Sequence, residues 1–173
     1  MTFKESVRDK LIIAANEYCK LVGIVFVIVS DSFIYRNEYL LRFHKDNFLH
    51  LTGGVHAKIN ANEFFEKCLD GSIGVDDYVC DSSDDLKGKA KEKLRNLATI
   101  GNFFEKELVF QEMFEKNRVK CKLATSDGKC TLGFISINKI VHVPLTLLNK
   151  NQIDESVKIT SFSITKNKTP KAK

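Results

Sequence analysis

Residues 119–137 read V-K-C-K-L-A-T-S-D-G-K-C-T-L-G-F-I-S-I, and this stretch decides the fold class. Before the turn, Cys121 and Leu123 alternate with lysines, which is the two-residue period of a strand with one buried face. Asp127-Gly128 accepts the positive φ angles of a type I′ turn, so we expect the chain to return as a second strand. The stretch therefore predicts a β-hairpin in a mainly antiparallel sheet.

Further strands are predicted on both sides of this hairpin. Ile140–Val143 is expected as a strand that Pro144 ends, and residues 157–165 alternate again and are expected to close the sheet. Upstream, a nearly continuous apolar run predicts a buried strand, and two segments after it predict one or two more. These upstream segments are residues 24–29, 33–36 and 39–43.

Amphipathic helices are predicted in the first two-thirds of the chain. An apolar stripe at three- and four-residue steps begins at the N-terminus, where Thr2 and Glu5 fit a capping box. Asn60 is expected to cap a second helix that Gly71 ends, and a lysine-rich third helix begins near Leu86. Helices followed by antiparallel strands indicate an α+β fold, with the N-terminal helices packed on the sheet.

Length and composition indicate one globular domain that is not membrane-embedded. The 173 residues include 43% hydrophobic residues and 28% charged ones, enough for a core and too polar for a membrane protein. We expect one domain over residues 1–165 and a basic flexible tail over residues 166–173. The net charge is +5, and four lysines of that tail account for most of it. A nucleic-acid site must therefore be a local basic patch.

Five cysteines are scattered along the chain, and no two have C-x-x-C spacing. Reduced thiols in a cytoplasmic protein explain this pattern, so we expect neither a disulfide framework nor a zinc site. The aspartates of residues 76–85 lack the pattern of a calcium loop and are expected to form a solvated linker. The sequence thus predicts no metal and no cofactor.

One segment has the composition of a reactive site. Three of the four histidines, His44, His50 and His56, lie close together in sequence. Polar and basic residues accompany them: Arg42, Lys45, Asn47, Thr52 and Lys58. A neutral histidine can take the proton of an RNA 2′-hydroxyl, and a cation can stabilise the charge that grows on the phosphate. In the alternative interpretation, His50 is a hydrogen-bonded structural residue between two leucines.

The same segment carries a family resemblance. R-F-H-K-D-N-F-L-H-L-T-G at residues 42–53 resembles the F-x-x-x-N-F-L-H-L-T-G signature of a phage-associated nuclease group of the barnase–EndoU–colicin–RelE-like (BECR) superfamily. Further matches follow in order at residues 62–69 (F-Y/F-E-K-C-L), 93–97 (K-L-x-x-L), 133–134 and 144–146. The chain departs from the pattern at Gly54, where the family usually has an apolar residue, and at Thr146, where serine is commoner.

This resemblance implies a BECR (barnase/RelE-like) nuclease fold and metal-independent RNA cleavage by 2′-hydroxyl attack. His50, as general base or acid, Thr52, as an orienting hydroxyl, and the supporting Asn47 match the motif. Charge and position add Arg42 and Lys45 on the phosphate. The remaining candidate substrate-binding residues are Lys58, His44 and Thr146.

A prophage or mobile-element toxin is the expected setting for such a ribonuclease. Its expected partners are RNA, such as tRNA or mRNA, and an antitoxin or immunity protein, with no membrane. The alternative is a non-catalytic RNA- or protein-binding module that keeps a degenerate nuclease fold.

Overall fold

The computed structural model describes residues 1–81 and 83–168, apart from the side chains of residues 85 and 86. The chain, for which the sequence predicted a single domain over residues 1–165, forms two compact units. The first unit combines Met1–Leu21 with Lys45–Asn102, and the second combines Val22–His44 with the chain from Phe103 onward. Each unit is thus built from two separate stretches of sequence.

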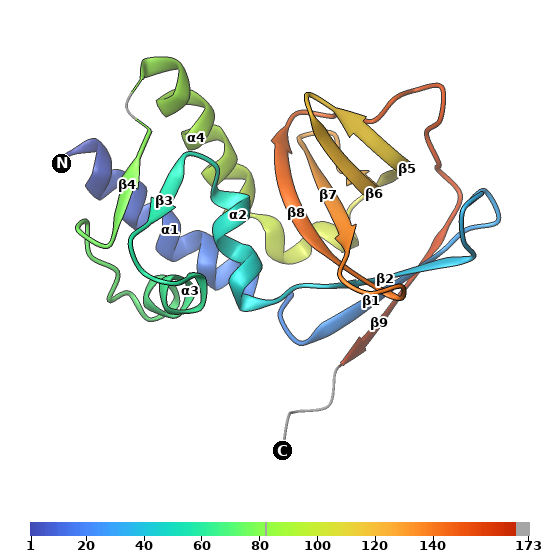
Figure 1. Cartoon of the computed structure of the whole chain (residues 1–173), viewed down its shortest axis with the longest axis horizontal. Helices are drawn as coiled ribbons and strands as arrows, with labels where there is room; N and C mark the ends of the chain where they lie inside the picture. Colours follow the sequence, from blue (N-terminus) through green and yellow to red (C-terminus); the bar gives the residue numbers. More distant parts are fainter. Residues whose placement is uncertain (82, 169–173) are drawn as a thin grey trace. The chain divides into compact units, whose positions relative to one another are not determined.

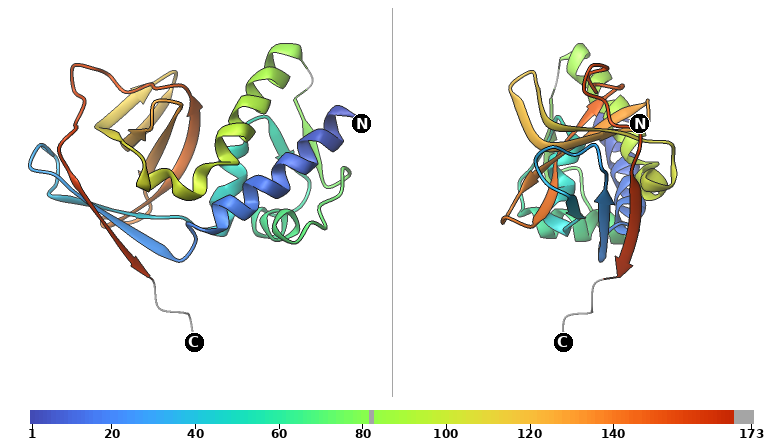
Figure 2. Two further views of the ribbon diagram at one scale, coloured as in Figure 1. Left: turned by 180° about the vertical axis from the view of Figure 1, so that it is seen from behind. Right: turned by 90° about the vertical axis from the view of Figure 1, so that its right-hand side faces the viewer.

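The first unit is mainly helical (Figures 1 and 2). Its elements are α1 (Phe3–Cys19), η1 (Lys45–Asn47), α2 (Phe48–Thr52), β3 (Val55–Ala57), α3 (Ala61–Asp70), β4 (Tyr78–Cys80) and α4 (Asp84–Leu97), and η2 (Ile100–Glu105) begins in it. Helix α1 packs against α2, α3 and α4. Buried aromatic rings fill the space between them, including Tyr18, Phe48, Phe64, Phe65 and Tyr78.

Local sequence signals explain where these helices begin. At α1 the Thr2 hydroxyl accepts a hydrogen bond from the Glu5 backbone (3.1 Å), and the Glu5 carboxylate accepts one from the Thr2 backbone (2.7 Å). This is the predicted capping box. At α3 the Asn60 side chain accepts from the Glu63 backbone (2.8 Å), and Gly71 follows the helix with φ +82°. Both predicted helix starts are confirmed.

The second unit is a seven-stranded sheet (Figure 1). Its strands are β1 (Ile24–Val29), β2 (Glu38–Arg42), β5 (Val109–Lys116), β6 (Val119–Ser126), β7 (Cys130–Ser136), β8 (Val141–Asn149) and β9 (Ser163–Lys168). Their order is β5-β6-β7-β8-β2-β1-β9, and every neighbouring pair is antiparallel except β2 with β8. Stacked and edge-on contacts among Phe26, Phe43, Phe104 and Phe134 occupy its core. The antiparallel-dominated α+β class is confirmed, and the packing of the N-terminal helices on the sheet stays a prediction.

The predicted hairpin is present as β6 and β7, with Ser126 opposite Thr131. Its turn differs from the predicted type I′, because Gly128 has φ +92° whereas Asp127 has a negative φ. The Asp127 carboxylate instead accepts the backbone N–H groups of Lys129 (2.9 Å) and Cys130 (3.0 Å). A side chain therefore organises the turn that backbone torsion alone was expected to form.

Two strand predictions are wrong for identifiable reasons. Residues 33–36 form a loop, because the backbone N–H groups of Ile34 and Tyr35 bond to the Glu112 carboxylate and not to a strand. Pro144 does not end its strand, since β8 continues to Asn149. Strand β2 pairs only with the start of β8, and a register shift lies opposite the proline on β7, so its missing N–H is tolerated.

Strand β1 and the C-terminus also differ from expectation. Only Phe26 and Ile28 of β1 are buried, so the strand has one core face and is not buried on both. The edge of β1 that faces away from β2 pairs with β9, with Lys166 opposite Phe26 and Lys168 opposite Ile24. The flexible tail predicted from residue 166 is thus wrong for residues 166–168, and residues 169–173 lie outside the described residues.

Candidate nucleic-acid site

The segment that was predicted to form the reactive site, from Arg42 to Lys58, begins in the sheet unit and continues in the helical unit. Arg42, at the end of β2, and His44 belong to the sheet unit, and the residues from Lys45 onward belong to the helical unit. His50 is exposed on α2, whereas Thr52 is fully buried and its hydroxyl donates to the Leu49 carbonyl (2.7 Å). Because Thr52 is fully buried, the orienting role predicted for it would require its hydroxyl to become accessible to a substrate.

The other predicted site residues lie in varied environments. The exposed Lys45 ammonium pairs with the Glu66 carboxylate, which raises the pKa of Lys45 by hydrogen bonding and by charge. Lys58 is exposed, and Asn47 is partly buried. Thr146 lies on β8 opposite Gly133. The roles assigned to all these residues stay predictions.

The backbone conformation and the close approach of Lys93 explain why a glycine stands at the end of the H-L-T-G segment. Gly53 has φ +51°, and a Cβ atom there would lie 2.5 Å from Cδ of Lys93. Burial, and then the charge of Lys89, lower the pKa of Lys93. The next residue, Gly54, lies against Asp81, whose carboxylate pairs with His56 (3.0 Å). Two quoted motif segments, residues 42–53 and 93–97, therefore meet through one lysine and one glycine.

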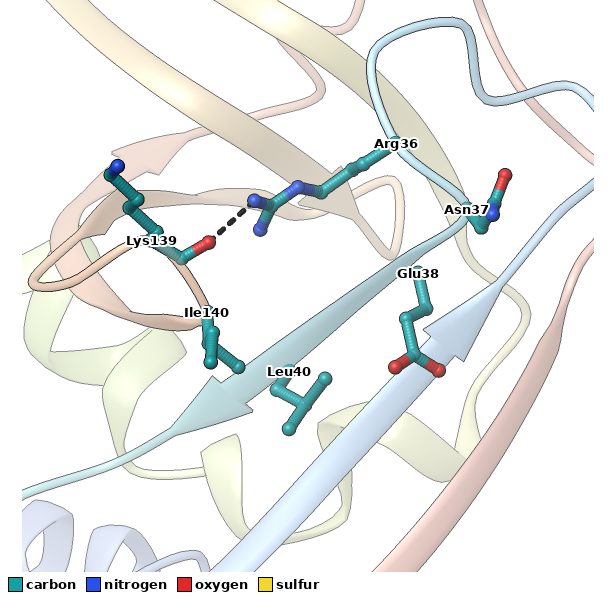
Figure 3. Close-up of a pocket in the computed structure, with 6 residues that line it drawn as sticks. All are labelled: Arg36, Asn37, Glu38, Leu40, Lys139 and Ile140. Atoms are coloured by element: carbon teal, nitrogen blue, oxygen red, sulfur yellow. Dashed lines mark hydrogen bonds between the residues drawn. The ribbon is translucent and has the colours of Figure 1, made fainter.

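The sheet unit holds a basic hollow of about 350 Å³. Its lining residues are Tyr35, Arg36, Tyr39, Met113, Lys122, Ser136, Lys139 and His142. A neighbouring hollow of about 470 Å³ shares Arg36 and Lys139 with it and is drawn in Figure 3. There the Arg36 guanidinium points to the Lys139 backbone carbonyl and donates to it (2.6 Å). None of the predicted site residues lines either hollow.

His142 is the buried titratable group of the basic hollow. Its Nε2 atom lies 3.5 Å from Nη1 of Arg36, and because a guanidinium only donates, Nε2 acts as the acceptor of a neutral imidazole. Its Nδ1 atom is buried with no well-aligned hydrogen-bond partner among the residues described. Burial and the Arg36 charge lower the pKa of His142, and backbone groups of Ile140 and Leu40 partly oppose this. His142 is therefore neutral at pH 7.

A carboxylate joins the neighbouring loop to the sheet. Glu112 accepts hydrogen bonds from the Tyr39 hydroxyl and from the backbone N–H groups of Ile34 (2.7 Å) and Tyr35 (3.2 Å). Desolvation, and then the bond to Glu112, raise the pKa of Tyr39. The next residue, Met113, has φ +51°, a strained conformation for a non-glycine residue and one that often accompanies functional sites.

The basic hollow can therefore combine proton transfer with phosphate binding. It joins a neutral histidine and a tyrosine–carboxylate pair to three cationic side chains. Sequence reasoning missed Arg36, Tyr39, Glu112 and His142, because the fold brings them together from three distant segments. The one available signal was His142 itself, a histidine between two valines in a predicted strand.

The antiparallel-dominated α+β fold is consistent with the class of BECR-like nucleases. The family model of the phage-Barnase-EndoU-ColicinE5/D-RelE like nuclease4 matches residues 10–171, so the chain belongs to this family. The resemblance to the BECR superfamily is thereby confirmed, and the match spans both units. Membership supports a nuclease function and a nucleic-acid substrate.

Neither a curated protein nor a solved structure gave a significant match to the chain. Across the described ranges, no helix is long and apolar enough to cross a membrane.

Proposed function

We propose that the protein is an endoribonuclease that cleaves RNA by 2′-hydroxyl attack, without a metal, in the basic hollow of the sheet unit. The observation that carries this proposal is the grouping of Arg36, Tyr39 and His142, with Glu112 bonded to Tyr39. Family membership supports the nuclease class. The choice of RNA rests on chemistry, because a histidine base suits a nucleophile that the substrate itself carries.

Phosphate binding starts the proposed reaction. The phosphate draws the Arg36 guanidinium away from His142, and Lys122 and Lys139 hold its other oxygens. The freed Nε2 atom of His142 takes the 2′-hydroxyl proton. The 2′-oxygen then bonds to phosphorus, the bond to the 5′-oxygen breaks, and the leaving oxygen takes a proton from solvent. The products are a 2′,3′-cyclic phosphate and a free 5′-hydroxyl.

The deciding experiment is cleavage of RNA by the purified protein in the presence of EDTA. His142→Ala is expected to lower the rate by roughly 10²–10⁴-fold. Thermal unfolding of this variant, and of the milder His142→Gln, controls for loss of the fold. His50→Ala is the matched variant at the exposed histidine of the sequence-predicted site. A large loss in His50→Ala with a normal His142→Ala would place catalysis at the predicted segment instead.

Substrate and product provide independent checks. DNA lacks the 2′-hydroxyl, so it should survive, and mass spectrometry of the RNA fragments should find 2′,3′-cyclic phosphate ends. A requirement for magnesium, or fragments with a 5′-phosphate, would contradict the mechanism. RNA binding with no cleavage would favour the non-catalytic module.

The proposed setting is a prophage or mobile-element toxin that acts on cytoplasmic tRNA or mRNA and is restrained by an antitoxin or immunity protein. Induced expression in a bacterial host should arrest growth and fragment cellular RNA. His142→Ala, expressed to the same level, should do neither. Arrest by both proteins without RNA fragmentation would contradict a toxin that acts by RNA cleavage.

A further inference from the structure

Exposed apolar side chains gather around the hollows of the sheet unit. Tyr35 is 64% exposed, Ile140 is 63% exposed and Met113 is 45% exposed, and each lines a hollow. Two further exposed apolar residues lie in the connections that carry Tyr35 and Ile140: Ile34 between β1 and β2, and Ile137 between β7 and β8. Clustered exposed apolar groups mark binding surfaces, whereas single ones are ordinary. The cationic centre of the site thus has apolar borders.

Tyr35 forms one border. Its ring is exposed, but its backbone N–H is held by the Glu112 carboxylate, the same group that binds the Tyr39 hydroxyl. The next residue, Arg36, is tied to the Lys139 carbonyl. An aromatic ring on an anchored backbone can stack on a flat ligand with little loss of conformational entropy.

A third hollow, of about 300 Å³, forms the other border. It shares Met113, Lys122 and Ser136 with the basic hollow. Its other lining residues are Phe114, Glu115, Lys120, Cys121 and Ile135. Phe114 and Cys121 are buried, so they give it an apolar floor, and lysines lie at its edge. An apolar floor beside cations suits a nucleotide, because the faces of its base are flat and apolar and its phosphate is anionic.

We infer that the site takes an unpaired RNA strand, with one base stacked on Tyr35 and the base across the cleaved phosphate in the hollow beside Met113. This inference rests on the proposed function, because it places the phosphate in the basic hollow. A duplex is excluded as substrate, since both faces of a paired base are covered by its neighbours in the helix. Every base has a flat face that can stack, so base stacking depends little on sequence. The site therefore distinguishes single-stranded from double-stranded RNA more strongly than it distinguishes one sequence from another.

Binding can be measured apart from catalysis. A fluorescein-labelled 2′-O-methyl RNA strand lacks the nucleophile, so its anisotropy reports affinity without cleavage. Tyr35→Ala should weaken binding by about 5- to 150-fold, the range for loss of one base–aromatic stack. Tyr35→Phe keeps the ring and should bind normally. Val157→Ala, at an exposed apolar residue of the same unit that lines none of the hollows, should also bind normally.

The second arm tests the strand state and the apolar hollow. The same strand annealed to its complement should compete only weakly, and Met113→Ala should weaken binding of the single strand. Equal affinity for duplex and single strand, or unchanged binding by Tyr35→Ala, overturns the inference. Single strands could also bind tightly, in a manner that depends on the Tyr35 ring, while ordinary RNA is not cleaved. That result would support the binding site and contradict the proposed function.

Discussion

At the scale of one residue, His142 shows how burial changes the pKa of a side chain and so its ability to accept a proton. Burial lowers the pKa of His142 most, and the charges of Arg36 and Lys122 lower it further. The Tyr39 ring packs against the imidazole with 5.2 Å between ring centres. If neutral His142 accepts the proton, kcat/KM should fall on an acidic limb whose midpoint lies below the ordinary histidine pKa of about 6.5. A pH–rate profile checks this. An acidic limb centred above 6.5 would contradict the role.

The lowered pKa of His142 also leads to a prediction about stability. A histidine whose folded pKa lies below its unfolded value binds more protons when unfolded, so stability falls as the pH drops below about 6.5. Urea unfolding of the native protein should show this loss between pH 6.5 and the folded pKa. His142→Gln should show a smaller loss over that interval. An equal loss in both proteins would mean that other groups control the acid limb.

Gly53 and Gly71 form a matched pair for a backbone prediction. Both have positive φ, but a Cβ at Gly53 meets the Lys93 side chain, whereas one at Gly71 meets nothing within 4 Å. Gly71→Ala should cost about 1 kcal/mol of unfolding free energy, and Gly53→Ala about 1–2 kcal/mol more. Adding Lys93→Ala to Gly53→Ala should recover the excess. Equal costs in urea unfolding would show that Lys93 moves aside freely.

At this scale the sequence indicated the motif but not the hydrogen bonds around it. Crowding in sequence singled out His50 and Thr52, yet the Thr52 hydroxyl is satisfied inside its own helix. The groups of the basic hollow lie far apart in sequence, and Glu112 of β5 bonds to Tyr39 of β2 although three strands separate them in the order of the sheet. Local composition cannot show a contact that depends on the order of strands.

The β6–β7 hairpin permits a prediction at the scale of an element. The Asp127 side chain is 3% exposed, and its carboxylate accepts from the Lys129 and Cys130 backbones and from the Lys106 ammonium. Desolvation raises its pKa, but these bonds outweigh it, so the pKa is lowered overall. Asp127→Ala removes all of these bonds, including the one from the partly buried Cys130 N–H, and should cost about 2–4 kcal/mol of unfolding free energy.

Chemical denaturation measures that cost, and Asp154→Ala is the control. Asp154 also accepts a backbone bond two residues on, from Ser156, but it is exposed, so its loss should cost about 1 kcal/mol or less. Similar costs at the two aspartates would contradict the view that burial of the Asp127 carboxylate organises the hairpin.

Elements with complete local signals were predictable. Helix α3 has a cap, a periodic apolar face and a terminal glycine within one short segment, and the hairpin has alternation and a turn. The failures depend on distant partners. Residues 33–36 have strand-like composition, but the Glu112 carboxylate accepts the N–H groups of Ile34 and Tyr35. Pro144 is tolerated because of a register shift on β7.

At the scale of the whole molecule, chain order and compact units do not coincide. The sheet unit takes β1 and β2 from before the helical segment and its remaining strands from after it. Composition does not reveal this arrangement, since both units carry apolar periodicity and mixed charge. The family model nevertheless matches residues 10–171 as one stretch, so the two units belong to one family pattern.

Net charge leads to the last prediction. The chain carries +5, but the proposed phosphate contacts are local: Arg36, Lys122 and Lys139. Three contacts to a single strand predict a slope of about −2 for log K against log salt, and Lys122→Ala should reduce it by about 0.7. Lys116, exposed on β5 and lining none of the three hollows, is the control. Anisotropy titrations of the 2′-O-methyl strand at several salt concentrations give these slopes. If Lys116→Ala lowers the slope as much as Lys122→Ala, RNA is held by diffuse charge, and the basic hollow loses its role as the phosphate site.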